Sequence, residues 1–171
     1  GWLADEPVQL KAAFTNAAAE MDVLITSGGV SVGDADYTRQ VLTELGNVNF
    51  WQVAIKPGKP FAFGQIDHCW FFGLPGNPVA VMVTFYQFVR NALLQLNGAL
   101  KPEIPLVLVQ SAEAIRKKSG RTEFQRGVLF RNSEGKLFVK STGSQGAGIL
   151  RSMSEANCFM ILHHDQGNIA P

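Results

Sequence analysis

The chain has 171 residues, of which 46% are hydrophobic and 17% are charged, and its formal net charge is +1. This much apolar surface excludes an intrinsically disordered chain, because burying it offsets the entropy lost on folding. The small net charge argues against a protein that binds nucleic acid over its whole surface. The charge is unevenly divided, since residues 1–100 carry 5 Lys/Arg and 8 Asp/Glu (−3), whereas residues 101–171 carry 10 and 6 (+4). We therefore expect two structural units with different surfaces.

The apolar segments predict neither a membrane span nor a disulfide. The longest of them, Val79 to Val89, is shorter than the roughly 20 residues that a membrane span needs. Cys69 and Cys158 both lie in apolar runs, which is typical of buried free thiols in a cytosolic protein. The chain begins with Gly1 rather than Met, as expected for a fragment. We expect a cytoplasmic protein that binds neither membranes nor nucleic acid.

Alternating helical and strand patterns run through residues 1–98 and predict an α/β domain. Asp5-Glu6-Pro7 is typical of a helix start, and apolar residues follow it at helical spacing from Leu10 to Met21. A second helix is expected over residues 37–45, and a long third one from Pro78 to about Gly98, with Asn77 as its N-cap. Strands are predicted over residues 23–26, 48–55, 61–64 and 69–72. We expect the helices to cover a mainly parallel sheet.

From residue 99 onward the pattern changes to short strands separated by Gly, Asn and Ser turns. Strands are predicted over residues 106–109, 124–130, 136–140 and 158–162, with a hairpin turn over residues 131–135. The segment Lys101–Pro105 is typical of a linker, and no helical stripe follows it. The sequence therefore predicts two domains, residues 1–98 and residues 99–171, of which the second is a small all-β unit.

Three loops that follow predicted strands share features of anion-binding sites. They are residues 26–36 with Gly28-Gly29, Lys56-Pro57-Gly58-Lys59-Pro60, and Pro75-Gly76-Asn77-Pro78. Backbone N–H groups beside paired glycines, two lysines in a proline-stiffened loop, and the N–H groups of a helix start each suit a phosphate. Each loop also has a simpler interpretation, as a glycine-rich turn, a solvated turn or a capped helix start. One site for a phosphorylated ligand would explain all three together.

Two acidic residues, Asp34 and Asp36, follow the first loop two positions apart. Carboxylates beside a phosphate site suit Mg²⁺, a hard cation that shares its ligands with phosphates. They equally suit the capping of the next helix, which needs only one acid. The residues themselves leave both interpretations open.

Three motifs, in this order, resemble those of the molybdopterin molybdenumtransferase family, the bacterial MoeA and gephyrin E-domain proteins. The motifs are Thr26–Thr38, Ile55–Phe63 and Phe72–Val79. Gln125–Gly127 and Thr142–Gly146 resemble motifs of the family's C-terminal β domain, so the resemblance covers nearly the whole chain. It implies a partial three-layer α/β/α pterin-binding domain followed by a small all-β, barrel-like domain.

The resemblance implies a transferase of molybdenum cofactor biosynthesis. Such an enzyme inserts molybdate into adenylylated molybdopterin and cleaves the adenylate with Mg²⁺. The implied catalytic residues are Asp5, Asp36, Lys56 and Lys59, and the implied metal ligands are Asp34 and Asp36. The residues implied to bind molybdopterin are Ser27, Gly28, Gly29, Ser31, Gly33, Pro57, Gly58, Gly76, Asn77 and Arg126. The family also implies a homodimer, formed through the full-length protein, and a molybdopterin adenylyltransferase as a partner.

Three residues depart from the family pattern: Gln52 stands in place of a Lys, and Ala80 and Ala147 stand in place of Ser. Each departure removes a polar group from the expected anion pocket. The alternative is therefore a non-catalytic interaction scaffold of the gephyrin E-domain type, or a fragment that binds the pterin phosphate without turnover. A fragment is also expected because the family's dimerisation region and the start of its pterin domain lie upstream of the matched motifs.

Overall fold

The computed structural model describes residues 1–30, 37–100 and 103–171, which form two compact units. Unit 1 comprises Gly1–Val53 and Gly58–Phe85, and unit 2 comprises Ala54–Pro57 and Tyr86–Pro171. The short segment Ala54–Pro57 therefore belongs with the C-terminal part of the chain. The domain boundary expected between residues 98 and 99 stays a prediction.

Unit 1 contains a four-stranded mixed sheet. Its strands, in the order β1-β5-β4-β2, are β1 (Val23–Ser27), β5 (Cys69–Leu74), β4 (Pro60–Ile66) and β2 (Asn47–Gln52). β1 and β5 are parallel, whereas β4 is antiparallel to both β5 and β2. The prediction of a mainly parallel sheet is wrong. A tight turn at Asp67, which has a φ of 51°, joins β4 to β5 as a hairpin, and a hairpin is necessarily antiparallel.

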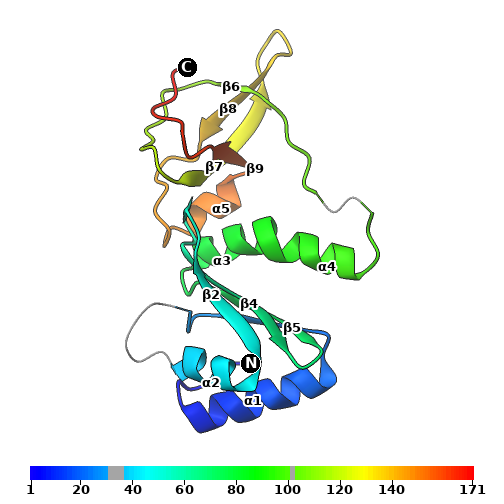
Figure 1. Ribbon diagram of the computed structural model, residues 1–171. Helices are drawn as coiled ribbons and strands as arrows, with labels where there is room; N and C mark the ends of the chain where they lie inside the picture. The colour runs from blue at the N-terminus through cyan, green and yellow to red at the C-terminus, as the bar shows by residue number, and fades with distance from the viewer. Residues whose placement is uncertain (31–36, 101–102) are drawn as a thin grey trace. The chain divides into compact units, whose positions relative to one another are not determined.

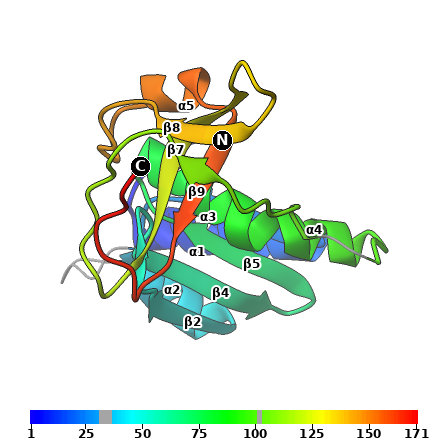
Figure 2. The same cartoon turned by 90° about the horizontal axis from the view of Figure 1, so that it is seen from above.

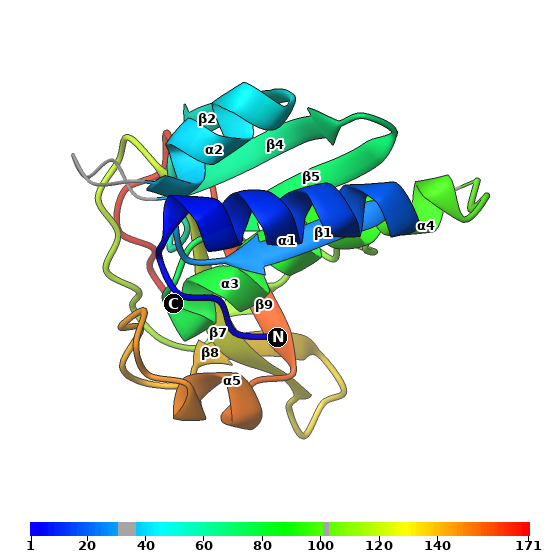
Figure 3. The same cartoon turned by 90° about the horizontal axis from the view of Figure 1, so that it is seen from below.

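Helices cover both faces of this sheet. α1 (Pro7–Glu20) and α2 (Tyr37–Leu45) lie side by side on one face, as Figure 3 shows. α3 (Pro78–Thr84) lies on the opposite face of the same sheet (Figure 1). The three-layer α/β/α arrangement is thereby confirmed.

Alternation along β5 connects the sheet to both helical layers. Phe71 points to the face covered by α1, where its ring centroid lies 5.9 Å from that of Phe14. Phe72, the next residue, points to the other face and lies 5.0 Å from the ring of Phe63. The predicted apolar stripe of α1 is confirmed, since its three buried residues are Leu10, Phe14 and Ala18.

The helix that begins at Pro78 continues beyond α3. A π-helical turn, η1 (Phe85–Val89), leads into α4 (Arg90–Leu96). Asn77 occupies the N-cap position as predicted, although its side chain makes no capping hydrogen bond. The stretch Pro78–Leu96 is long and apolar enough to cross a membrane by length and composition, a test that the buried helix of a soluble protein also passes. Three of its valines are fully buried: Val79, Val83 and Val89.

Unit 2 contains a five-stranded sheet organised around one long strand, β7 (Thr122–Arg131). β7 pairs in parallel with β3 (Ile55–Lys56) and antiparallel with both β8 (Leu137–Ser141) and β9 (Cys158–Leu162) (Figure 2). β6 (Gln110–Ser111) extends the sheet beyond β8. The described strands form an open order from β3 to β6, so the unit is a half-barrel. The predicted hairpin is confirmed, because Arg131 pairs with Leu137 across its turn.

Unit 2 differs from the sequence prediction in two places. Residues 106–109 are not a strand: Leu106, Val107 and Leu108 are exposed, and no described strand pairs with them. Their apolar character fits a strand, but a strand also needs a neighbour for its backbone hydrogen bonds. The short helix α5 (Arg151–Glu155) interrupts the expected all-β unit, and five residues are too few to show a helical period in the sequence.

Both cysteines are free thiols, as predicted. Cys69 is buried on β5, and Cys158 is partly buried on β9. Burial raises the pKa of both thiols, with Asp22 adding to the effect at Cys69. The reactive thiolate form is therefore scarce at neutral pH, and neither residue is a candidate nucleophile.

A close approach between β4 and β2 provides a test of this fold. A Cβ added to Gly64 would touch the backbone oxygen of Asn47 and lie 2.6 Å from Val48 Cα. Since a paired backbone cannot move aside without breaking its ladder, we expect Gly64→Ala to lower the free energy of unfolding by about 1–3 kcal/mol. Urea unfolding measures this loss. The matched control is Gly167→Ala, where nothing lies within 4 Å, and equal midpoints for both variants would contradict the described register.

Candidate functional site

In unit 1 the loops that follow β1 and β5 lie next to each other. Because these strands are parallel, their carboxyl ends reach the same edge of the sheet. The backbone N–H of Gly28 donates to the carbonyl oxygen of Leu74 at 3.0 Å. A Cβ on Gly76 would lie 3.6 Å from Gly28 Cα. The structure thus brings together five residues expected to bind molybdopterin: Ser27, Gly28, Gly29, Gly76 and Asn77.

The paired glycines give the first of these loops its shape. Gly28 and Gly29 have φ values of 87° and 66°, a region that other residues rarely adopt. A Cβ on Gly29 would also touch the hydroxyl of Thr38 on α2. The two glycines carry no side chain of their own, which a close approach of phosphate oxygens to the backbone requires.

One buried polar atom at this edge has no partner among the described residues. It is Oγ1 of Thr26, which precedes the loop at the end of β1. A buried hydroxyl without a hydrogen bond costs free energy, so such atoms are rare in folded proteins. A polar group of a ligand bound at this edge would satisfy it. The residues present therefore fit a phosphorylated ligand here.

Of the other residues predicted for unit 1, Gly58 and Lys59 directly precede β4, whose start lies at the same edge as the carboxyl end of β5, because Ala62 pairs with Gly73 in antiparallel register. Asp5 is exposed two residues before α1, and Lys59 is exposed just before β4, where its carbonyl accepts a hydrogen bond from Val53 N at 2.8 Å. Gly58 is buried with a φ of 107°. Ser31, Gly33, Asp34 and Asp36 lie outside the described residues. Within the described ranges, no group of three His, Cys, Asp or Glu side chains could hold a metal ion.

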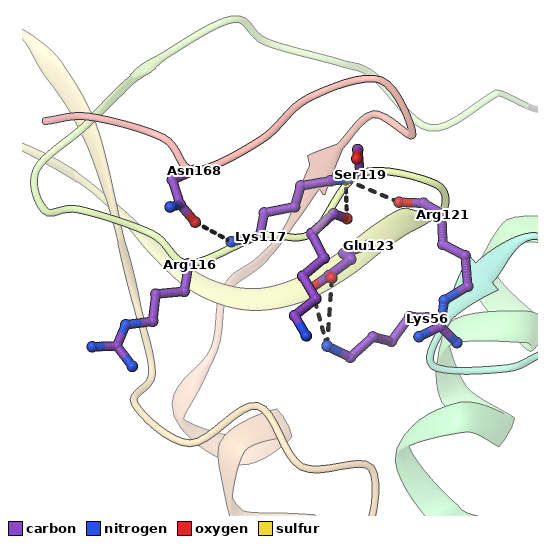
Figure 4. A pocket seen from close by; sticks show the side chains of 8 residues that line it. Lys56, Arg116, Lys117, Ser119, Arg121, Glu123 and Asn168 are labelled. Carbon is purple, nitrogen blue, oxygen red and sulfur yellow. Dashed lines mark hydrogen bonds and ion pairs between the residues drawn. The ribbon is translucent and has the colours of Figure 1, made fainter.

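In unit 2, Lys56 is oriented by Glu123, a residue that the sequence analysis missed. The pairing of β3 with β7 sets the two residues opposite each other. Lys56 Nζ lies 3.4 Å from both carboxylate oxygens, as the dashed lines in Figure 4 show. Glu123 is 5% exposed and also accepts a hydrogen bond from Gln125 Nε2 at 3.0 Å. The Lys56 side chain is half-exposed, so its ammonium is both oriented and open to an anion. Pro57, joined to Lys56 by a cis peptide bond, is half-buried.

Two cavities of unit 2 share Lys56, Arg116 and Glu123. The larger, of about 590 Å³, is also lined by Lys117, Lys118, Ser119, Arg121 and Asn168. The smaller, of about 260 Å³, is also lined by Glu113, Ala114, Ile115, Gln125, Ser141, Gly143 and Gln145. Of all these residues only Lys56 was expected at a site. The run of four cations between positions 116 and 121 is the sequence signal that could have found the larger cavity.

Arg126 is enclosed within unit 2 and is 1% exposed. Its Nε donates to Ser152 Oγ at 2.9 Å and its Nη2 donates to the carbonyl oxygen of Gly146 at 3.1 Å. Burial lowers the pKa of its guanidinium. The Gln145 side chain holds the Arg126 backbone, accepting from its N–H at 2.7 Å and donating to its carbonyl at 3.1 Å. The two motifs noted in this half of the sequence therefore bind each other. A contact of Arg126 with molybdopterin stays a prediction.

The three departures from the family pattern occupy different environments. Gln52 is exposed at the end of β2, Ala80 is buried on α3, and Ala147 is half-buried. None of them lines either of the two cavities of unit 2. Their predicted effect on molybdate binding is untested.

Comparisons with known proteins agree with this architecture. Residues 1–95 match the family model described as "Probable molybdopterin binding domain", and residues 109–171 match "MoeA C-terminal region (domain IV)". The chain is 45% identical over 171 residues to the molybdopterin molybdenumtransferase of Haemophilus influenzae, covering 99% of this chain and 42% of that protein. It is 33% identical over 192 residues to gephyrin of Dictyostelium discoideum, covering 99% of this chain and 27% of that protein.

A solved structure shows the same fold. The crystal structure of a molybdopterin biosynthesis MoeA protein from Pyrococcus horikoshii matches with a TM-score of 0.74 and 27% identity, over 99% of this chain and 38% of that one. The resemblance noted from the motifs is thereby confirmed. The chain spans less than half the length of these relatives.

The Arg126 network provides a test of what this residue does for stability. Arg126→Ala leaves Ser152 and the Gly146 carbonyl without their buried charged donor. At roughly 1.5 kcal/mol for each charge-assisted hydrogen bond, we expect the free energy of unfolding to fall by about 3 kcal/mol. Chemical unfolding measures the loss. The control is Arg131→Ala, an exposed arginine bonded to Gly135, which should change stability far less. A variant as stable as the parent would show that this network does not hold unit 2 together.

Glu113, on the smaller cavity, gives unit 2 a dependence on pH. Its pKa is lowered chiefly by the hydrogen bonds of Ser141, whose N–H donates to Oε1 at 2.7 Å, and then by Lys140. Its stabilising effect is therefore complete above its ordinary pKa of 4.5 and is lost as the pH falls through the lower folded-state value. We expect Glu113→Gln to be less stable than the parent at neutral pH, and the difference to shrink below pH 4.5. Unfolding titrations at several pH values, with Glu134→Gln as the exposed control, measure this, and a pH-independent difference would contradict it.

Proposed function

Because this chain belongs to the molybdopterin-binding family that includes the molybdopterin molybdenumtransferases, we propose that it forms the molybdopterin-binding part of such an enzyme. The observation that supports this most directly is the pair of adjoining loops at the edge of β1 and β5. The positive-φ glycines leave the backbone of the first loop without side chains of its own, and the Thr26 hydroxyl beside them lacks a partner among the described residues. Such an edge suits the phosphate of molybdopterin.

In this proposal the whole protein inserts molybdate into adenylylated molybdopterin and cleaves the adenylate. Ser27, Gly28, Gly29, Ser31, Gly33, Gly76 and Asn77 would hold the pterin phosphate. Lys56 and Lys59, in the loop with Pro57 and Gly58, would attract the molybdate oxyanion or the phosphates. Asp5 is proposed as a further catalytic residue and Arg126 as a further residue that binds molybdopterin. Glu123 supports this role for Lys56, because it orients the ammonium without burying it.

Asp34 and Asp36 are proposed to hold Mg²⁺, which would neutralise charge on the phosphate oxygens. We also propose that residues 1–98 form the pterin-binding domain and residues 99–171 the C-terminal β domain. A cytoplasmic homodimer that works with a molybdopterin adenylyltransferase belongs to the same proposal.

The gephyrin relative leaves a second function, an interaction scaffold whose pocket has lost its activity. The relatives named molybdopterin molybdenumtransferase favour the enzyme, since the one from Haemophilus influenzae is 45% identical and the gephyrin is 33% identical. Titration of the intact protein with molybdopterin separates the two functions. Absence of binding at millimolar ligand would exclude the proposed function and favour the scaffold.

The unpartnered hydroxyl of Thr26 allows a test that separates binding from folding. Thr26→Val keeps the shape of the side chain and removes a buried hydroxyl that has no partner among the described residues, so we expect stability to rise by about 1 kcal/mol. If molybdopterin bonds to this hydroxyl, its affinity should fall about five- to tenfold, which corresponds to about 1 kcal/mol. Thermal unfolding and ligand titration of the intact protein measure the two effects.

The matched control is Thr84→Val on α3. The buried hydroxyl of Thr84 donates to the carbonyl oxygens of Ala80 at 2.8 Å and Val81 at 3.1 Å. Its loss should therefore lower stability and leave molybdopterin affinity unchanged. If Thr26→Val binds molybdopterin as tightly as the parent, the ligand does not contact this edge of the sheet through Thr26.

A further inference from the structure

Three cations on the larger cavity of unit 2 have no ionic partner among the described residues. Arg116, Lys118 and Arg121 are exposed, and no carboxylate in the described part of the chain pairs with their side chains. Of the described residues that line the cavity, Glu123 is the single acid, and its carboxylate is already bonded to Lys56 and Gln125. The cavity therefore carries an uncompensated positive charge.

The buried side chain of Lys117 holds in place the loop that contains these cations, residues 116–121. The ammonium of Lys117 is enclosed, with the residue 5% exposed. It donates to three backbone carbonyl oxygens, those of Lys118 at 3.1 Å, Arg121 at 3.0 Å and Gln166 at 3.1 Å. Its backbone N–H donates to Asn168 Oδ1 at 3.0 Å (Figure 4). The loop is thus joined to the C-terminal segment, so its cationic side chains project from a fixed backbone.

We propose that this cavity binds a small phosphate monoester. Guanidinium groups bind phosphate oxygens through two parallel hydrogen bonds, and Arg121 extends toward the Lys56–Glu123 pair in Figure 4, whereas Arg116 extends away from it. The Ser119 hydroxyl on the same cavity supplies a further donor. A dianion would balance much of the charge of Arg116, Lys118 and Arg121.

The size of the cavity favours an organic phosphate over a free ion. Its volume of about 590 Å³ falls in the range of roughly 300–1,000 Å³ that is usual for small-molecule sites. A phosphate ion alone fills a small part of that space, which leaves room for the organic group of an ester. A concave site of this kind also suits a small dianion better than an extended acidic peptide. The inference goes beyond the proposed function in the role that it gives to Arg116, Lys118 and Arg121, and the cavity shares Lys56 with that function.

The test is calorimetric titration of the intact protein with glycerol 3-phosphate, inorganic phosphate and a poly-glutamate peptide. We expect glycerol 3-phosphate to bind more tightly than inorganic phosphate. The double substitution Lys118→Gln with Arg121→Gln should weaken its affinity at least tenfold. The control, Arg131→Gln with Lys136→Gln, removes the same charge from the β7–β8 hairpin and should change affinity less than twofold. All four side chains are exposed, and unfolding curves check that each variant is folded.

Three results would overturn the proposal. They are equal affinities in the parent and the Lys118/Arg121 variant, tighter binding of inorganic phosphate than of the ester, and binding of the peptide alone. Failure of this proposal can also be distinguished from failure of the proposed function. The Lys118/Arg121 variant should leave the loops of unit 1 intact, and its loss of glycerol 3-phosphate affinity should be the same when the two substitutions are made in the Thr26→Val background.

Discussion

The parallel pairing of β1 with β5 is the constraint on which the candidate site of unit 1 depends. Two loops that are far apart in the sequence become neighbours only because both strands end at the same edge. The hydrogen bond from Gly28 N to Leu74 O continues the pairing one residue beyond β1. The first glycine of the loop is therefore aligned by the sheet itself. A loop that is positioned in this way does not have to be ordered when a ligand binds.

β7 has the corresponding role in unit 2. Side chains alternate along a strand, so Glu123 and Gln125 lie on one face and Arg126 lies on the other. On the first face the hydrogen bond between Gln125 and Glu123 fixes the carboxylate that orients Lys56. On the second face Arg126 is bonded to neutral oxygen atoms inside the unit. One strand thus separates an open polar site from a closed polar network.

Local patterns predicted most of the helices and strands, because their signals lie within a few residues. Pro7 and Pro78 occupy the first helical positions as expected, and β9 has the predicted bounds. The strand orientation was wrong because it depends on the conformation of one turn, at Asp67. The strand expected at residues 106–109 was wrong because its apolar pattern says nothing about whether a neighbouring strand is available.

The candidate site, like the fold, could be predicted from the sequence only in part. The glycine loop and the Pro-Gly-Asn-Pro loop were predicted as one site, and the structure places them together. The Lys56–Glu123 pair could not be predicted, because its members are 67 positions apart and meet only through the pairing of β3 with β7. A lone Glu in a strand carries no signal of such a partner. For Arg126 the reverse holds. The sequence motif identified this residue, but it did not indicate that the side chain is enclosed, as the structure shows.

The fold encloses part of the positive charge of residues 101–171 and gathers another part on one cavity. Lys117 and Arg126 are buried against neutral oxygen atoms, which satisfy their hydrogen bonds without cancelling their charge. Arg116, Lys118 and Arg121 line one cavity, where their like charges repel each other. Glu123 is already engaged by Lys56, so it cannot fully compensate them. An anion supplied from outside the chain would offset this repulsion. The net charge of +1 therefore conceals a local positive potential at this cavity.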